Sequence, residues 1–203
     1  MRSAIAVDAA QKHDVPALSR VLGRAFFDDP VMTWMLPEDK RRAAALPRMF
    51  AAMVRHHYLA GGGVEVAHRV GEVGAAALWD PPGRWRQTQS EELRMMPGLL
   101  LALGRRAGRG MAVSELMKSH HPDEPHWYLG VIGSDPQVRG VGFGKELMLS
   151  RLSRCDAEGA PCYLESTKES NVAYYMRYGF DVTGELALPD GGPGIWQMWR
   201  PPR

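Results

Sequence analysis

The sequence predicts an α/β protein built on a mixed, partly parallel sheet. Three observations lead to this expectation. Strand and helix patterns alternate through the second half of the chain, and a glycine-rich stretch joins one of these strands to the next helix. A length of 203 residues suffices for one domain with a substantial core. We therefore expect residues 1–203 to form a single domain.

The first quarter of the chain is expected to supply a first strand and two helices. Residues 3–7 match a strand pattern, and Asp14 is expected to cap a helix that has Pro16 in its first turn. Residues 38–59 also follow a helical pattern. A break is expected at Pro47, because proline removes a backbone donor and clashes with the preceding turn.

The middle of the chain predicts a hairpin followed by a long helical region. Two strands are expected at 63–69 and 72–80. Residues 88–119 are mostly helical in pattern, with interruptions expected at Pro97–Gly98 and Gly104–Gly110. The rest of the chain is then expected to form strands at 126–134, 161–166, 180–187 and 194–200, and helices at 142–157 and 171–178.

Composition narrows the classes of partner. The chain is 45% hydrophobic and 24% charged, which is ordinary for a globular protein, and a net charge of +2 argues against nucleic acid or an anionic membrane. No apolar run is long enough to cross a bilayer, and the N-terminus lacks the core of a secretory signal. Cys155 and Cys162 form neither a disulfide framework nor a thiolate metal site, and they fit a reducing cytoplasm. We expect a cytoplasmic protein.

The stretch "DPQVRGVGFGKEL", from Asp135 to Leu147, is typical of a phosphate-binding turn. Glycine lets the backbone approach an anion, and the N–H groups of a helix start point at it. A Walker loop does not fit, because Lys145 is followed by glutamate, and the dinucleotide fingerprint fails in either register. What remains is Arg-x-x-Gly-x-Gly at Arg139, Gly142 and Gly144. The alternative is a glycine turn that binds no ligand.

This loop, together with "YLES" and "NVAYYMRYGF", resembles the GCN5-related N-acetyltransferases, in which Arg/Gln-x-x-Gly-x-Gly/Ala holds the acetyl-CoA pyrophosphate. The segments "AFFDDP", "ALWDPPG", "HHPDEPHWYL" and "GIWQMWRPP" look most like the puromycin N-acetyltransferases and related actinobacterial enzymes. Two departures from the family pattern are Ser134, where an apolar residue is usual, and Arg139, where glutamine is commoner. Neither removes a backbone donor.

The resemblance implies a twisted, mostly antiparallel sheet flanked by helices, with one parallel pair that splays apart. Acetyl-CoA would be the cosubstrate, with its pantetheine arm in the gap. The backbone of Ile132, Gly133 and Ser134 would flank this arm, and Asn171 would contact it. The residues implied around the pyrophosphate are Arg139, Gly140, Val141, Gly142, Phe143, Gly144 and Lys145.

Two residues are candidates for the proton transfers that amine acetylation needs. Glu165 ends a predicted buried strand, where burial would raise its pKa towards that of a useful base. The alternative is a solvated or ion-paired glutamate. Tyr175 precedes the Gly-Phe pair by four residues, as the family tyrosine does, and a neutral phenol can protonate a thiolate. The alternative is that Tyr174, Tyr175 and Tyr178 pack one helix face.

Two other clusters of polar residues are expected to have structural roles. The run "HHPDEPH" matches no metal-ligand spacing, so we expect a surface loop and no metal. Asp28 and Asp29 are expected to cap the segment after Pro30, with a role in lining an amine pocket as the alternative.

These features predict an acetyl-CoA-dependent N-acetyltransferase that acts on a primary amine of a small molecule. Attack would be direct, in a ternary complex. The alternatives are a protein or peptide N-acetyltransferase and a catalytically silent acyl-CoA-binding module. We expect a monomer or homodimer.

Overall fold

The computed structural model describes residues 4–203. The strands are β1 (Ala6–Ala9), β2 (Val64–Arg69), β3 (Glu72–Asp80), β4 (Trp127–Ser134), β5 (Cys162–Ser166), β6 (Asp181–Ala187) and β7 (Gly194–Arg200). The α-helices are α1 (Val15–Ala25), α2 (Pro30–Met35), α3 (Asp39–Met53), α4 (Leu59–Gly61), α5 (Gln89–Leu103), α6 (Ala107–Ser119), α7 (Phe143–Ala157) and α8 (Val172–Met176). None of the helices described is long and apolar enough to cross a membrane.

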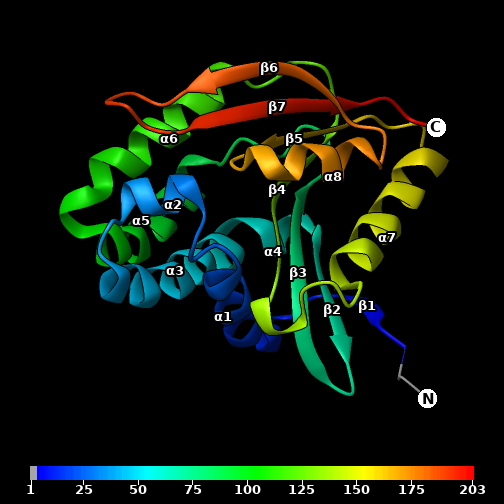
Figure 1. Cartoon of the computed structure of the whole chain (residues 1–203), viewed down its shortest axis with the longest axis horizontal. Coiled ribbons are helices and arrows are strands. Elements are labelled where there is room, and N and C mark those ends of the chain that lie inside the picture. Colours follow the sequence, from blue (N-terminus) through cyan, green and yellow to red (C-terminus); the bar gives the residue numbers. More distant parts are fainter. Residues whose placement is uncertain (1–3) are drawn as a thin grey trace.

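All seven strands belong to one sheet, in the order β1-β2-β3-β4-β5-β7-β6. Neighbouring strands are antiparallel except for β4 and β5, which run parallel. Figure 1 shows α7 on one side of the sheet and α1, α3, α5 and α6 on the other. The predicted mixed α/β fold with one parallel pair is confirmed.

Strand β3 shows how the sequence separates the two sides of the sheet. Ala76 and Leu78 belong to the core that α1, α2 and α3 cover, whereas Ala75, Ala77 and Trp79 belong to the core beneath α7. Side chains alternate across a strand, so a strand covered on both faces needs an unbroken apolar run. The segment "GAAALW" supplies that run and fixes β3 in the middle of the molecule.

Three local expectations were wrong. The first strand is Ala6–Ala9 and not 3–7, and Ser3 lies outside the described residues. Asp14 does not cap α1; its carboxylate accepts a hydrogen bond from the backbone N–H of Gln11 at 2.8 Å. Pro47 does not break α3, because its ring packs closely on α1 at Gly23, where a Cβ would lie 2.7 Å from it. Packing therefore outweighs the lost backbone donor.

The helical region after β3 is also more continuous than expected. Pro97 lies inside α5, and no interruption occurs at Pro97–Gly98. The first break comes at Gly104, whose positive φ of 52° ends α5 before α6 begins. The two helices thus form a pair of long walls on one side of the sheet.

Candidate active site

The site lies where β4 and β5 separate. The parallel pairing covers only three positions, from Trp127↔Cys162 to Leu129↔Leu164. Beyond them β4 continues along β3, and β5 continues along β7. The register between β3 and β4 also shifts here, which leaves Gly130 as an extra residue in a β-bulge. The two strands therefore diverge and leave an opening in the sheet.

This opening leads into a cavity of about 1570 Å³. Its walls come from the ends of β4 and β5, the glycine loop before α7, and α2, α3, α5, α6 and α8. A pocket for one small ligand is typically about 300–1,000 Å³. The cavity is therefore large enough for two ligands, one at the glycine loop and one against the helices.

The glycine loop has the geometry of an anion seat. Gly140 has a φ of 79°, and Gly142, the residue before α7, has a φ of 112°. These conformations suit glycine, and the first residues of α7, Phe143 to Lys145, line this end of the cavity, so the free N–H groups of the helix start lie there. Arg139 and Lys145 add positive charge on either side, and Arg139 is held by a 3.1 Å hydrogen bond to the carbonyl of Ala25.

Most of the residues predicted to bind the cofactor share this end of the cavity. The cavity is lined by Ile132, Gly133, Ser134, Arg139, Gly140, Gly142, Phe143, Gly144, Lys145 and Asn171. Val141 is not among the lining residues. Its side chain is 39% exposed on the loop surface.

Glu165 immediately follows the last residue of β5 that pairs with β4, and its side chain is completely buried. Burial raises its pKa to about 7, because the ionised form loses its hydration. The Tyr163 hydroxyl donates a hydrogen bond to Oε1 at 3.1 Å and, with Tyr128, limits this rise. Among the described residues, Oε2 has no hydrogen-bond partner. The site thus contains a buried carboxyl group with a raised pKa and one unsatisfied oxygen.

Sequence reasoning missed two histidines beside this glutamate, because it placed them in a surface loop. His121 and His126 are buried, and burial lowers the pKa of both side chains, that of His121 to about 3. Stacking of His121 on Trp85, with ring centroids 3.7 Å apart, removes it from solvent. The described residues contain no group of three or more His, Cys, Asp or Glu arranged to hold a metal.

Hydrogen bonding fixes how these two neutral histidines are protonated. His126 donates from Nδ1 to the carbonyl of Glu124 at 2.6 Å, so its Nε2 is an acceptor. His121 then donates from Nε2 to that atom at 3.0 Å. This leaves the lone pair on His121 Nδ1 facing Glu165 Oε1 at 3.9 Å. A lone pair opposite a carboxylate disfavours the charged form, in the same direction as burial.

A tyrosine from the opposite wall also reaches the splay. Residues Val54–Tyr58 form a π-helical turn between α3 and α4, a feature found frequently at functional sites. The Tyr58 hydroxyl lies so close to Gly130 that a Cβ there would be 2.2 Å from it. Behind Tyr58, the buried His57 links Asp80 at 3.1 Å to Glu91 at 3.4 Å and anchors the turn. Because the Tyr58 hydroxyl occupies the space beside Gly130, the bulge requires glycine at that position.

The three tyrosines of α8 and its C-terminal turn occupy different positions. Tyr174 and Tyr175 line the cavity, whereas Tyr178 does not line it and donates to the Tyr174 hydroxyl at 3.2 Å. Tyr175 is 8% exposed, and burial raises its pKa above the ordinary value. Its phenol therefore stays protonated at neutral pH.

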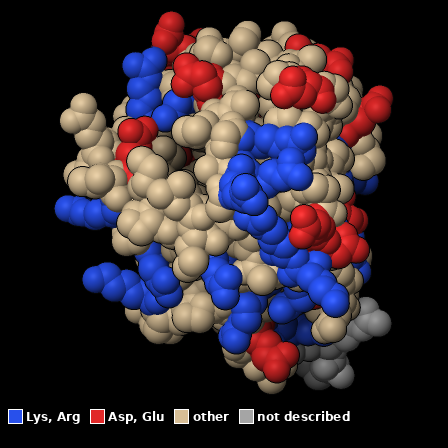
Figure 2. Space-filling view, turned by 90° about the vertical axis from the view of Figure 1, so that its left-hand side faces the viewer, with Lys and Arg blue, Asp and Glu red and all other residues tan. Residues whose placement is uncertain are grey.

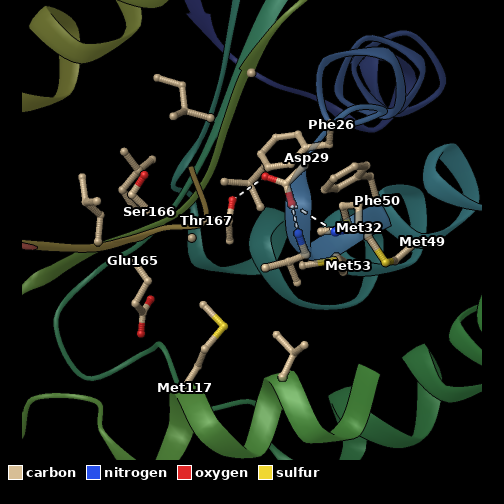
Figure 3. A pocket seen from close by; sticks show the side chains of 18 of the residues that line it. Phe26, Asp29, Met32, Met49, Phe50, Met53, Met117, Glu165, Ser166 and Thr167 are labelled. Carbon is tan, nitrogen blue, oxygen red and sulfur yellow. Dashed lines mark hydrogen bonds between the residues drawn. The ribbon is translucent and has the colours of Figure 1, made fainter. Parts of the chain in front are cut away.

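Asp29 caps α2, as expected, and also lines the cavity. Its Oδ1 accepts hydrogen bonds from the N–H groups of Val31 at 2.9 Å and Met32 at 3.1 Å, so it caps α2. Its Oδ2 accepts a hydrogen bond from the Thr167 hydroxyl, which ties α2 to the end of β5. Figure 3 shows this bridge beside the cavity, with Glu165 further along β5. Burial raises the pKa of Asp29.

Comparison with known proteins identifies the class. The site combines a splayed parallel strand pair, a glycine loop before a helix and a buried glutamate. The sequence profile of the acetyltransferase (GNAT) family matches residues 76–180, and the chain belongs to this family.

The individual relatives agree with this assignment. An uncharacterized N-acetyltransferase of Schizosaccharomyces pombe is 26% identical over 189 residues, which cover 87% of this chain and 74% of the relative. A Corynebacterium glutamicum structure, described as histone acetyltransferase HPA2 and related acetyltransferase, is 29% identical with a TM-score of 0.76, over 100% of this chain and 98% of that one. A Drosophila melanogaster polyamine N-acetyltransferase shares the fold at 15% identity, with a TM-score of 0.62 over 98% and 100% of the two chains.

A matched pair of glycine variants tests whether the glycine loop binds acetyl-CoA. Gly140 and Gly71 have the same φ of 79°, and a Cβ at either would meet nothing within 4 Å. Gly140→Val and Gly71→Val should therefore introduce similar backbone strain, but only Gly140 lines the cavity. We expect Gly140→Val to weaken acetyl-CoA binding roughly tenfold or more in calorimetry, because the side chain blocks approach to the backbone. Equal affinities in the two variants would assign the loop to structure alone.

Proposed function

We propose that this protein is an acetyl-CoA-dependent N-acetyltransferase that acts on a primary amine of a small molecule, by direct attack in a ternary complex. The observation that carries the proposal is the buried Glu165, whose pKa is raised to about 7 and whose Oε2 has no partner among residues 4–203. It stands at the wall of a cavity that is continuous with the glycine loop.

The residues at the glycine loop fit acetyl-CoA. Gly140 and Gly142 adopt the positive φ values that expose backbone N–H groups, and Arg139 and Lys145 supply positive charge for a pyrophosphate. The unpaired edge of β4 from Gly130 to Ser134 offers backbone groups to an extended arm. When bound, acetyl-CoA supplies an acetyl thioester near the splay.

The first task of the site is to produce a neutral amine, because a protonated amine cannot attack. We assign this task to Glu165. A base with a pKa of about 7 is half ionised near cellular pH and still holds a transferred proton well. Direct contact with the amine or contact through one water serves equally.

The second task is to stabilise the negative charge that develops on the thioester oxygen and then on the leaving sulfur. Backbone N–H groups of β4 beyond the bulge are fixed donors. We assign protonation of the departing sulfur to Tyr175, which lines the cavity and retains its proton because burial raises its pKa.

Two observations favour a small amine over the alternatives. Helices α2, α3, α5 and α6 wall the acceptor end, whereas a peptide needs an open groove. Both Glu165 and Tyr175 line the cavity, which disfavours a silent binding module. The resemblance to puromycin N-acetyltransferases adds aminoacyl-like amines to the candidates.

The role of Glu165 predicts a specific pH profile. The ionised form is the active base, so kcat/KM should rise with pH through an apparent pKa near 7 and then level off. Glu165→Gln should lower turnover about a hundredfold at pH 7, recover partly above pH 9 as more free amine exists, and leave acetyl-CoA affinity nearly unchanged. Thiol release at several pH values measures this. Wild-type turnover across the range would exclude Glu165 as the base.

The assignment of the acid is tested by removing one hydroxyl at a time. Tyr175→Phe keeps the ring in its buried site and should lower kcat by roughly a hundredfold, with acetyl-CoA affinity nearly unchanged. Tyr178→Phe, which loses only a hydrogen bond to Tyr174, serves as the control and should be much milder. A large loss in Tyr174→Phe with an active Tyr175→Phe would move the acid to the other tyrosine that lines the cavity.

A further inference from the structure

The acceptor end of the cavity is lined by methionine to an unusual degree. Eight of the chain's twelve methionines line the cavity, and they come from α2, α3, α5 and α6. Figure 3 shows Met32, Met49 and Met53 on one wall and Met117 on α6 opposite Glu165. We call this end the methionine chamber. Methionine is flexible and polarisable, so such a surface can fit apolar groups of several shapes.

Several large apolar side chains on the walls of this chamber are exposed. Met96 is 48% exposed, Leu100 is 50% exposed and Met111 is 67% exposed, and all three line the cavity. Among the described residues, α6 has no buried side chain at all. Large apolar side chains that face a concave space mark a surface that a ligand covers.

Two of the carboxylates at the chamber are already engaged. Both oxygens of Asp29 accept hydrogen bonds within the protein, and Glu92 is paired with Lys118 at 2.9 Å. Glu115 on α6 also lines the chamber, and the structure records no ion pair for it. On the side of the molecule where α5 and α6 lie, Figure 2 shows a band of Lys and Arg side chains, which repels polycations.

We propose that the acceptor is a primary amine with a single positive charge on a bulky apolar body, and that this body occupies the methionine chamber while the amine faces Glu165. The proposal rests on the proposed function and names its substrate class. A second cation, as in a polyamine, would have to enter an apolar chamber in which Glu115, a carboxylate without an ion pair among the described residues, lies exposed on α6 and not in the interior, which is unfavourable.

A matched pair of amines tests this directly. 1-Aminohexane and 1,6-diaminohexane have the same length and reacting group and differ by one terminal charge. We expect kcat/KM for the monoamine to exceed that for the diamine at least tenfold. From 1-aminobutane to 1-aminooctane, kcat/KM should rise about threefold to fourfold per methylene, the scale of hydrophobic burial.

A charge placed in the chamber should reverse the preference. Met53 on α3 lines the chamber. Met53→Asp should lower kcat/KM for 1-aminohexane at least tenfold, and the ratio of kcat/KM for the monoamine to that for the diamine should fall towards or below one. Leu101→Asp is the control, since Leu101 on α5 is 72% exposed and does not line the cavity. Its ratio should match the wild type. Acetyl-CoA binding should be unchanged in both variants, which also reports that they fold.

The possible results distinguish failure of the apolar substrate class from failure of the proposed N-acetyltransferase function. A wild-type preference for the diamine, or rates independent of chain length, would overturn the apolar substrate class while leaving N-acetyltransfer intact. Acetyl-CoA binding with no thiol release for any amine would contradict the proposed function and, with it, the substrate class. An unchanged ratio in Met53→Asp would show that the amine's body does not lie in the methionine chamber.

Discussion

The divergence of β4 and β5 is the constraint on which the site depends. A sheet normally satisfies its backbone groups strand against strand, and here the parallel ladder stops after Leu129↔Leu164. Strand β3 holds β4 on one side and β7 holds β5 on the other, so the gap cannot close. The bulge at Gly130 fixes where the separation begins, and the Tyr58 hydroxyl fills the space that a side chain there would need.

Burial of Glu165 follows from this geometry and carries an energetic penalty. Its pKa rises from 4.5 to about 7, and at about 1.36 kcal/mol per pKa unit the ionised form is disfavoured by about 3 kcal/mol. A folded-state pKa above the unfolded value contributes stability below pH 4.5, and that contribution is lost as pH rises through 7. Burial of this carboxyl beside His121 and Tyr163 therefore lowers the free energy of unfolding at high pH, while the Tyr163 hydrogen bond limits that loss.

The parts of this structure that the sequence predicts are those set by local pattern. Alternation gives the strands, and the glycine spacing gives the start of α7 within one residue. The features that the sequence did not predict depend on tertiary contacts. Nothing local to Pro47 reveals that Gly23 on another helix makes room for its ring, so the helix break was predicted wrongly. His121 and His126 read as loop residues because their burial depends on Trp85 and on β5, far away in sequence. Polar residues just before a buried strand are the signal that could have found them.

The fold holds the Glu165 carboxyl with a pKa near neutrality. The most direct test is to follow its side-chain carboxyl by NMR in protein carrying carbon-13 in glutamate, with Glu165→Gln used to assign the signal. We expect this carboxyl to titrate with a midpoint near pH 7, well above the ordinary value for glutamate. Titration near the ordinary value of 4.5 would contradict it, because the carboxylate would then be fully ionised at neutral pH and neither buried nor held as described.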